Sequence, residues 1–497
     1  MQMHSERSSD LASPLRIATS GLVLSGSILL VACLAVALIV HRGTIANTPT
    51  WQNAQVVLGL LALLAMTSLS LTALRRRDHR FPFFDVGVVC LMVTTLYFVV
   101  PLLNFLAGGM TFTLLSDNRL FVYNPSAQDL SPLVWGSVVY LGGFSMVYLI
   151  ARGKGYPLDV AVARPRQSRM VSVVALWALL ALSITAIEIV YGVSFSPSYR
   201  DLRTGEGLIT QLPYYLQQIM HNVRGMYHVA KQALLIIVFL YWKKLPIRIA
   251  GIIWLLSEIV WSVVRQGERT DVVLLLLTAA LLYHRMVRAL TFPRVAFGGC
   301  VLLVGVFVAG FMRDISLDVG GIAATDVSVL SAANEFQSLF GTAYDLHERQ
   351  ARGQLAAIPW TLYASEVLQL IPSQVLPFQK VGPADWYLEL LDLRGSQVGF
   401  MFGVLSQGVV GGGWVELLGR GVVLAGALAG LHRWYVRRAS SFNVTLVYVF
   451  MCVWSYYTVR ATTFYAIYFL IYRLGPFMLA VMIGERLLSA ARPRKNS

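Results

Sequence analysis

The sequence is dominated by apolar runs of about 20 residues that alternate with short segments rich in arginine. A helix of about that length crosses the hydrocarbon core of a bilayer. Over the whole chain 57% of residues are apolar and 13% are charged, whereas soluble proteins carry about 25% charged residues. One soluble core cannot absorb this excess, because cores stop growing at about 250–300 residues. The sequence therefore predicts an all-α polytopic membrane protein.

The apolar runs predict about twelve transmembrane helices joined by segments of unequal length. The chain then divides into 1–312 with nine helices, a large loop over 313–411, and 412–497 with three helices and a basic tail. Two arginine-bearing loops, 192–224 and 265–270, interrupt the first part. The twelve predicted helices cover residues 17–40, 54–74, 83–107, 131–151, 170–191, 225–242, 247–264, 271–284, 295–312, 412–432, 442–459 and 462–484.

Basic residues give these helices an orientation. The segments that would face one side hold 24 of the 40 lysines and arginines and six of the 25 acidic residues. Lysine and arginine are retained in cytoplasmic loops. We therefore expect both termini to lie in the cytoplasm and the large loop to lie on the opposite side.

The same patterns argue against several functional classes. The net charge of +15 sits in short segments between apolar runs, so we expect no nucleic-acid partner. The four cysteines each lie inside an apolar run and show no metal-binding or disulfide spacing. The sequence contains no nucleotide-binding loop, zinc-hydrolase motif or GxSxG motif. No cofactor and no metal are therefore expected.

The predicted outer side and the membrane spans together carry fourteen arginines but only two lysines, Lys231 and Lys380. The planar guanidinium binds phosphate through two hydrogen bonds and keeps its charge. These arginines therefore suggest a lipid-linked phosphate or pyrophosphate as ligand. Ordinary ion pairing with the acidic residues on the same side is the alternative.

Two loops sharpen the hypothesis of a phosphate ligand. Arg200 and Arg203 follow the fifth predicted helix in a glycine-bearing stretch, where a solvated turn is the alternative. Arg265 and Arg269 flank a hairpin so short that both are expected at or below the membrane surface. A structural ion pair within the hairpin is the alternative there. Arg460, between the last two predicted helices, is a third candidate.

The large loop supplies the candidate catalytic groups. Two helices are expected in it, at 331–352 and at 359–370. His347 is the only histidine in the loop and could act as a base near neutral pH, or could be a packed structural residue. The neighbouring carboxylates and arginines are Glu335, Asp345, Glu348, Arg349 and Arg352. Tyrosines in 454–472 could line a sugar path or belong to the interfacial aromatic belt.

Three stretches of the sequence form a further pattern: Tyr199-Arg200 with Arg203 and Gly205; Arg265 to Arg269 before a leucine run; and Ile371-Pro372 to Pro377, Lys380 and Gly395 to Gly419. With this layout and these stretches the chain resembles Wzy-type O-antigen polymerases, which belong with the O-antigen ligases to the integral-membrane lipid-linked glycan transferases. At 406–416 the chain departs from the family's pattern, so Glu416 receives no role.

The resemblance implies a GT-C-like fold in the bacterial inner membrane. It implies a metal-independent inverting glycosyltransferase of lipopolysaccharide biosynthesis, which joins oligosaccharide repeat units linked to undecaprenyl pyrophosphate. A chain-length-regulating co-polymerase is a candidate partner. Arg200, Arg203, Arg265 and Arg269 would bind the diphosphates, and His347, Glu335 or Asp345 would act on the acceptor hydroxyl. The further glycan-binding candidates are Arg349, Arg352, Lys380 and Arg460.

Two other hypotheses stay open at the level of sequence. A ligase would move finished glycan to lipid A-core by the same chemistry. A flippase would bind the lipid-linked glycan and move it across the membrane. A flippase is expected to have many charges along its spans, whereas the predicted helices contain few, chiefly Glu188, Lys231, Glu258 and Arg473.

Overall fold

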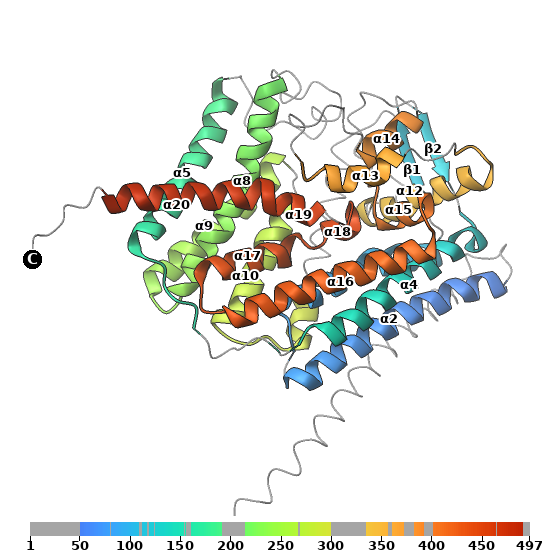
Figure 1. Ribbon diagram of the computed structural model, residues 1–497, viewed down its shortest axis with the longest axis horizontal. Helices are drawn as coiled ribbons and strands as arrows, with labels where there is room; N and C mark the ends of the chain where they lie inside the picture. Colours follow the sequence, from blue (N-terminus) through green and yellow to red (C-terminus); the bar gives the residue numbers. More distant parts are fainter. Residues whose placement is uncertain are drawn as a thin grey trace, which may run out of the picture.

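The computed structural model is a bundle of long helices with smaller elements gathered at one end (Figure 1). It describes residues 50–79, 81–108, 112–116, 119–123, 125–153, 155, 161–190, 214–266, 269–299, 334–355, 360–371, 382–391, 401–463 and 465–490. The prediction for 17–40 lies outside these ranges, and so does most of 295–312.

Eight of the described helices are long and apolar enough to cross a membrane. The chain is thus a multi-pass membrane protein, as predicted. The eight are α2 (Thr50–Asp78), α3 (Val86–Gly108), α4 (Ala127–Ala151), α5 (Gln167–Val190), α8 (Tyr214–Leu240), α9 (Leu245–Gln266), α16 (Trp414–Arg437) and the continuous unit α19 (Tyr465–Phe469), η3 (Leu470–Leu474) and α20 (Gly475–Ala490). Two shorter apolar helices, α10 (Arg269–Met286) and α17 (Phe442–Trp454), coincide with the eighth and eleventh predicted spans.

The eleventh span is shorter than the sequence suggests. The apolar run 442–459 predicts one helix, but α17 ends at Trp454 and a separate turn of helix, α18, covers Tyr457–Arg460. The hydroxyl of Ser455 donates to the carbonyl of Cys452 at 3.0 Å, and the hydroxyl of Thr458 donates to the carbonyl of Ser455 at 2.6 Å. Such local bonds compete with helical ones, and they accompany the break.

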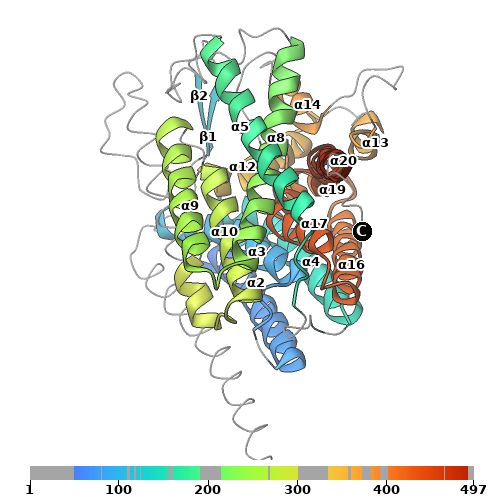
Figure 2. The ribbon, with the colours of Figure 1, turned by 90° about the vertical axis from the view of Figure 1, so that its left-hand side faces the viewer.

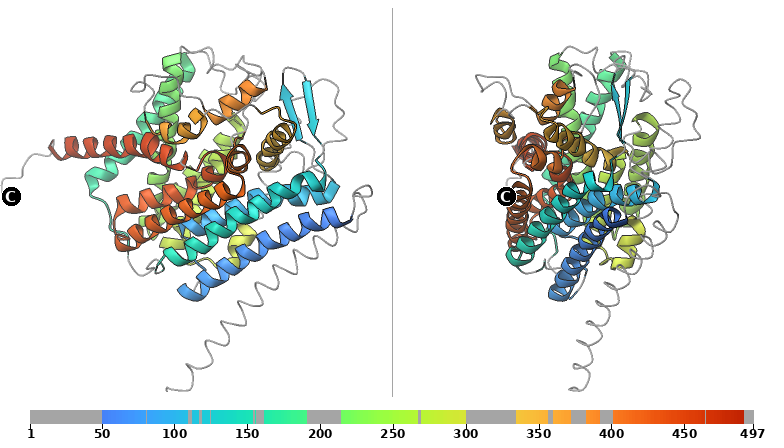
Figure 3. Two further views of the ribbon diagram at one scale, coloured as in Figure 1. Left: turned by 45° about the vertical axis from the view of Figure 1, so that its right-hand side comes forward. Right: turned by 90° about the vertical axis from the view of Figure 1, so that its right-hand side faces the viewer.

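Helices α2, α4 and α16 lie side by side and run in the same direction, as the left view of Figure 3 shows. At their first turns the hydroxyl of Ser131 donates to Gln55 at 2.5 Å, and the indole of Trp414 donates to the carbonyl of Pro132 at 3.1 Å. Glycines bring α4 and α16 together: a Cβ on Gly421 would lie 2.4 Å from the carbonyl oxygen of Tyr140. These three are the second, fourth and tenth predicted spans, which the charge pattern orients alike.

The opposite ends of these helices form what we call the basic end of the bundle. There Arg152 binds Asp78 and Asp85, each at 2.5 Å, and all three side chains are buried. Arg169 binds Glu485 at 2.6 Å. The basic segments that the sequence assigns to one side therefore meet at one end of the structure.

Asp85 is the centre of the buried polar network at the basic end. It accepts a hydrogen bond from the hydroxyl of Tyr148 and lies 3.6 Å from Nδ1 of His432. Burial alone would raise the pKa of the Asp85 carboxyl, but the charges of His432 and Arg152 hold that pKa below its ordinary value. The network joins α2, α3, α4 and α16.

The far end, which we call the loop end, carries the smaller elements. They are α12 (Asn334–Ala351), α13 (Trp360–Leu368), α14 (Pro383–Leu390), α15 (Val404–Val410) and an antiparallel hairpin of β1 (Phe112–Ser116) and β2 (Arg119–Tyr123). Helices α12 and α13 confirm the two predicted in the large loop, whereas the hairpin was not predicted. Rings of Phe98 on α3 and Phe340 on α12 meet edge to face at 6.4 Å.

A second group of spans consists of α5, α8, α9 and α10 (Figure 2). Within this group α8 and α10 pack against α17. Helix α9 ends at Gln266 and α10 begins at Arg269, so the seventh and eighth predicted spans are separated by two residues, which lie outside the described part. Arg285, near the other end of α10, donates to the hydroxyl of Tyr435 at 3.1 Å at the basic end. The hairpin therefore lies at the end of α10 remote from the basic end.

Candidate functional site

The candidate site lies at the loop end, where three glycines connect α15 to α16. A Cβ on Gly411 would fall 1.6 Å from a carboxylate oxygen of Glu416, and Gly413 has a φ of +61°. Glycine adopts that left-handed conformation without the steric cost of a side chain. The turn lets the amide of Gly412 donate to Glu416 at 2.7 Å. The glycine run thus fixes a carboxylate at the start of α16.

Arg420 connects this carboxylate to the large loop. Its Nε and Nη2 donate to one oxygen of Glu416, at 2.8 and 2.5 Å. Its Nη1 donates to Glu366 of α13 at 2.7 Å and to the hydroxyl of Thr463 at 3.0 Å. One guanidinium therefore joins the membrane helix α16, the loop helix α13 and the connection between α18 and α19.

Glu366 is the most deeply buried carboxylate of this cluster. Its side chain is 7% exposed, against 18% for Glu416. Burial raises the pKa of the Glu366 carboxyl above its ordinary value; the charge of Arg420 opposes the rise, and the charge of Glu416 adds to it. Glu366 therefore takes up a proton more readily than an ordinary glutamate side chain does.

Two carboxylates and one guanidinium form a proton-transfer site more readily than an anion site. The charge of Arg420 is already balanced by Glu366 and Glu416, so Arg420 has little capacity left for a phosphate. A buried carboxyl with a raised pKa is a recurring feature of general acid and base catalysis. Glu366, which Arg420 holds in place, is therefore the candidate proton acceptor of the cluster.

An aromatic segment borders the cluster. The aromatic rings between Trp454 and Tyr472 pack one against the next in a continuous row. The ring centroids of Trp454 and Phe469 are 4.6 Å apart. The hydroxyl of Tyr472 donates to the carbonyl of Leu370, just beyond α13, at 3.3 Å. The guanidinium of Arg460 lies over the ring of Tyr457 at 5.5 Å. The Arg460 candidate is therefore in the same region as the carboxylate cluster.

The candidates on α12 form a separate group. Asp345 is buried and accepts hydrogen bonds from the hydroxyl of Tyr387 at 2.7 Å and from Arg349 at 3.0 Å. Arg352, directly after α12, pairs with Glu348 of that helix. These contacts match the alternative of ordinary ion pairing. His347 is half-buried on α12, and Glu335 stands in its first turn, with its side chain outside the described part.

The structure describes only part of the two predicted arginine loops. Arg265 lies in the last turn of α9 and Arg269 begins α10, so both stand at the hairpin, but their side chains lie outside the described part. Arg200, Arg203 and Lys380 lie outside the described residues. Their roles as glycan and diphosphate ligands stay predictions.

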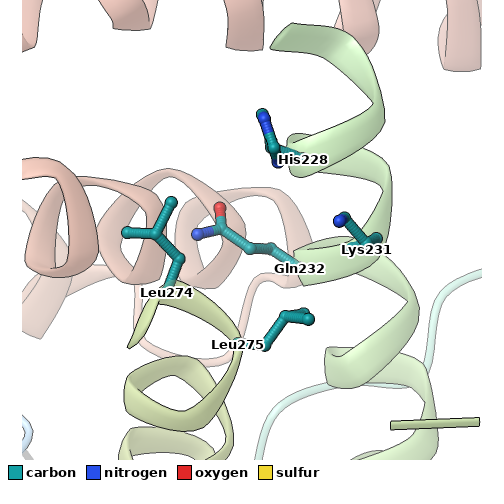
Figure 4. Close-up of a pocket in the computed structure, with 5 residues that line it drawn as sticks. All are labelled: His228, Lys231, Gln232, Leu274 and Leu275. Carbon is teal, nitrogen blue, oxygen red and sulfur yellow. The ribbon is translucent and has the colours of Figure 1, made fainter. Parts of the chain in front are cut away.

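Polar groups also meet inside the membrane portion of α8 and α9. Lys231 lies 3.7 Å from Glu258, which accepts a hydrogen bond from the hydroxyl of Tyr227 at 2.8 Å. Both members of the pair are buried. Intramembrane charges are functional candidates. A small cavity between α8 and α10, shown in Figure 4, is lined by His228, Lys231, Gln232, Leu274 and Leu275.

Sequence reasoning missed Glu366 and Arg420. The signal for Arg420 is its position four residues after Glu416 inside an otherwise apolar helix, where a charge requires a partner. Glu366 has no comparable signal, because its partner is 54 residues away. Across the described ranges, no cluster of three or more His, Cys, Asp or Glu side chains could hold a metal ion.

Comparison of the chain with protein-family models, with curated proteins and with solved structures found no match. The functional conclusion therefore depends on the geometry of the site.

Proposed function

We propose that this membrane protein polymerises oligosaccharide repeat units linked to undecaprenyl pyrophosphate, as part of O-antigen or related surface polysaccharide synthesis. The reaction takes place at the loop end, which faces the periplasm of a bacterial inner membrane, with both termini in the cytoplasm. The observation that carries the proposal is the buried Glu366 carboxylate, held by Arg420 at the junction of a membrane helix and the large loop.

The proposed chemistry is inverting glycosyl transfer. The anomeric carbon of the donor sugar forms a bond to the acceptor hydroxyl oxygen, and its bond to the pyrophosphate oxygen breaks. The hydroxyl proton passes to Glu366, and the pyrophosphate leaves with the electron pair of the broken bond. The leaving group is already good, so the site has to supply a base and charge stabilisation.

The surroundings of Glu366 fit a glycan acceptor. The tyrosines between Trp454 and Tyr472 present aromatic faces and hydroxyls next to the cluster, connected to it through Thr463. We infer that Arg200, Arg203, Arg265 and Arg269 hold the diphosphates, as the resemblance implies. His347 then has a supporting role or none, because Glu366 already supplies a base.

The three competing functions predict different polysaccharide patterns in a strain that lacks this gene. Surface polysaccharide is separated on a gel that resolves single repeats. Glycan that stops at one repeat on the core supports polymerisation. Bare core with long polymer left on the carrier lipid indicates a ligase, and bare core with unpolymerised, cytoplasm-facing intermediates indicates a flippase. The buried pair Lys231–Glu258 is the observation that favours translocation.

A further inference from the structure

Arg473 lies inside the last membrane-spanning unit, within the π-helical segment η3. Its guanidinium carbon is 3.8 Å from the ring centroid of Phe469 and 4.7 Å from that of Trp454. Aromatic faces attract a cation and cover its flat surfaces. π-helical segments inside α-helices occur frequently at functional sites.

The hydrogen-bond donors at this place have no acceptor among the described residues. Arg473 forms no described ion pair or hydrogen bond, although a guanidinium carries five N–H donors. The indole Nε1 of Trp454, whose side chain is 1% exposed, also has no described partner. Neither group can accept a hydrogen bond. The complementary ligand is therefore an acceptor, and the charge of Arg473 makes it an anion.

The position in the membrane narrows the class of anion. Arg473 is eight residues into the span that begins at Tyr465, or about 12 Å along the axis. Helix α8 closes one side, where Gly225 leaves room for the arginine stem: a Cβ there would lie 2.9 Å from Cγ of Arg473. The ring of His228, one turn further, is 6.2 Å from that of Trp454. Because Arg473 lies within a membrane-spanning unit, we expect a lipid to be the molecule that brings an anion to it.

We propose that Arg473 and Trp454 bind the phosphate of a polyprenyl carrier lipid at a site distinct from the Glu366 cluster. The guanidinium fork donates two hydrogen bonds to the phosphate oxygens, and the indole N–H donates a third. The rings of Phe469 and Trp454 cover the faces of the cation. The anionic ligand follows from the donors alone, whereas the choice of a polyprenyl carrier rests on the proposed function.

The test uses the full chain in phosphatidylcholine nanodiscs, titrated with undecaprenyl phosphate that carries a photoreactive group. We expect Arg473→Met to weaken binding at least about tenfold, and Arg473→Lys to weaken it less, because the ammonium keeps the charge but loses the fork. Arg486→Met is the matched control, since Arg486 is an exposed arginine on α20 at the basic end. It should bind like the wild type.

The crosslinked peptide in the wild type tests the site without any variant. We expect the photoreactive lipid to crosslink within residues 454–473. Crosslinks found only in other parts of the chain would overturn the proposal. Unchanged binding by Arg473→Met overturns it as well. Equal competition by phosphatidylglycerol or by inorganic pyrophosphate overturns the assignment to a polyprenyl carrier.

The same titration separates this site from the proposed function. Glu366→Gln should lose chain extension and keep wild-type binding of undecaprenyl phosphate. If Arg473→Met binds normally while Glu366→Gln still abolishes extension, the lipid site is wrong and the proposed function stands. If Arg473→Met loses binding while Glu366→Gln extends normally, the lipid site stands and the proposed catalytic role of Glu366 is wrong.

Discussion

Arg420 donates a hydrogen bond of 2.7 Å to Glu366, which joins a helix inside the membrane to a helix of the large loop. The contact fixes α13 over the start of α16 and holds a buried carboxylate next to the aromatic segment. It also means that Arg420 acts through Glu366, as a positioning residue, since its charge is already balanced by two carboxylates.

Glu366→Gln should abolish chain extension without loss of stability. The amide keeps a hydrogen-bond acceptor for Arg420 but cannot take up a proton. Because the pKa of Glu366 is raised, folding favours its neutral form, so a neutral side chain is not expected to destabilise the protein at pH 7. Polymer length in cells and the melting temperature in detergent check both parts. Glu389→Gln, at an exposed position on α14, is the control.

A lower melting temperature of Glu366→Gln with normal polymer would show that the contact only clamps α13 to α16. That result would falsify the catalytic role.

The rate of chain extension should fall on the acidic side at a pH above 4.5, the ordinary pKa of a glutamate carboxyl. The proposed base is inactive when protonated, and the raised pKa of Glu366 moves that protonation to higher pH. Arg420→Met removes the positive charge that opposes the rise in the pKa of Glu366. The acidic limb of the pH–rate profile should therefore move further toward neutral pH. Arg433→Met, at the exposed basic end of α16, should leave the limb in place. Initial rates from pH 4 to 8 measure the shift.

Asp85→Asn should destabilise the fold by about 3–5 kcal/mol, because it breaks a buried ion pair and leaves Arg152 partly uncompensated. The pKa of Asp85 is lowered in the fold, so its stabilisation is complete above the ordinary value of 3.8 and is lost as the pH falls below it. Melting temperatures of wild type and variant should therefore differ near neutrality and converge below about pH 4. A constant difference down to pH 3 would contradict this account.

Tyr387→Phe should destabilise the loop end by about 1–2 kcal/mol and leave chain extension intact. It removes a buried hydrogen bond of 2.7 Å to Asp345, a carboxylate that also accepts from Arg349. Thermal unfolding measures the loss, and polymer length measures activity. Loss of polymer in a stable Tyr387→Phe protein would return Asp345 to the list of catalytic candidates.

Arg265→Ala and Arg200→Ala should each abolish long polymer without loss of expression. Both arginines are predicted to bind diphosphate, and alanine removes the charge and the two-pronged hydrogen bonding. Arg288→Ala, at an exposed position at the basic end, should keep normal polymer. Polymer of normal length from either of the first two variants would remove that residue from the proposed site.

The positions of most described spans could be predicted from the sequence, because a helix in lipid needs a long apolar run whatever its neighbours are. It also predicted α12 and α13, whose apolar periodicity and flanking prolines are local properties. The break after Trp454 was missed, because it accompanies side-chain bonds of Ser455 and Thr458 that hydropathy does not register. The hairpin of β1 and β2 was missed as well.

The sequence by itself determined the class of the protein, the approximate spans and the grouping of basic segments on one side, since these follow from composition and periodicity along the chain. Only the tertiary structure decided which charges meet. Arg420 and Glu366, like Arg473 and Trp454, come from different segments, and their contacts arise when helices pack. A charge in lipid is stable only beside a suitable partner, and sequence spacing does not reveal a partner that packing brings from another helix.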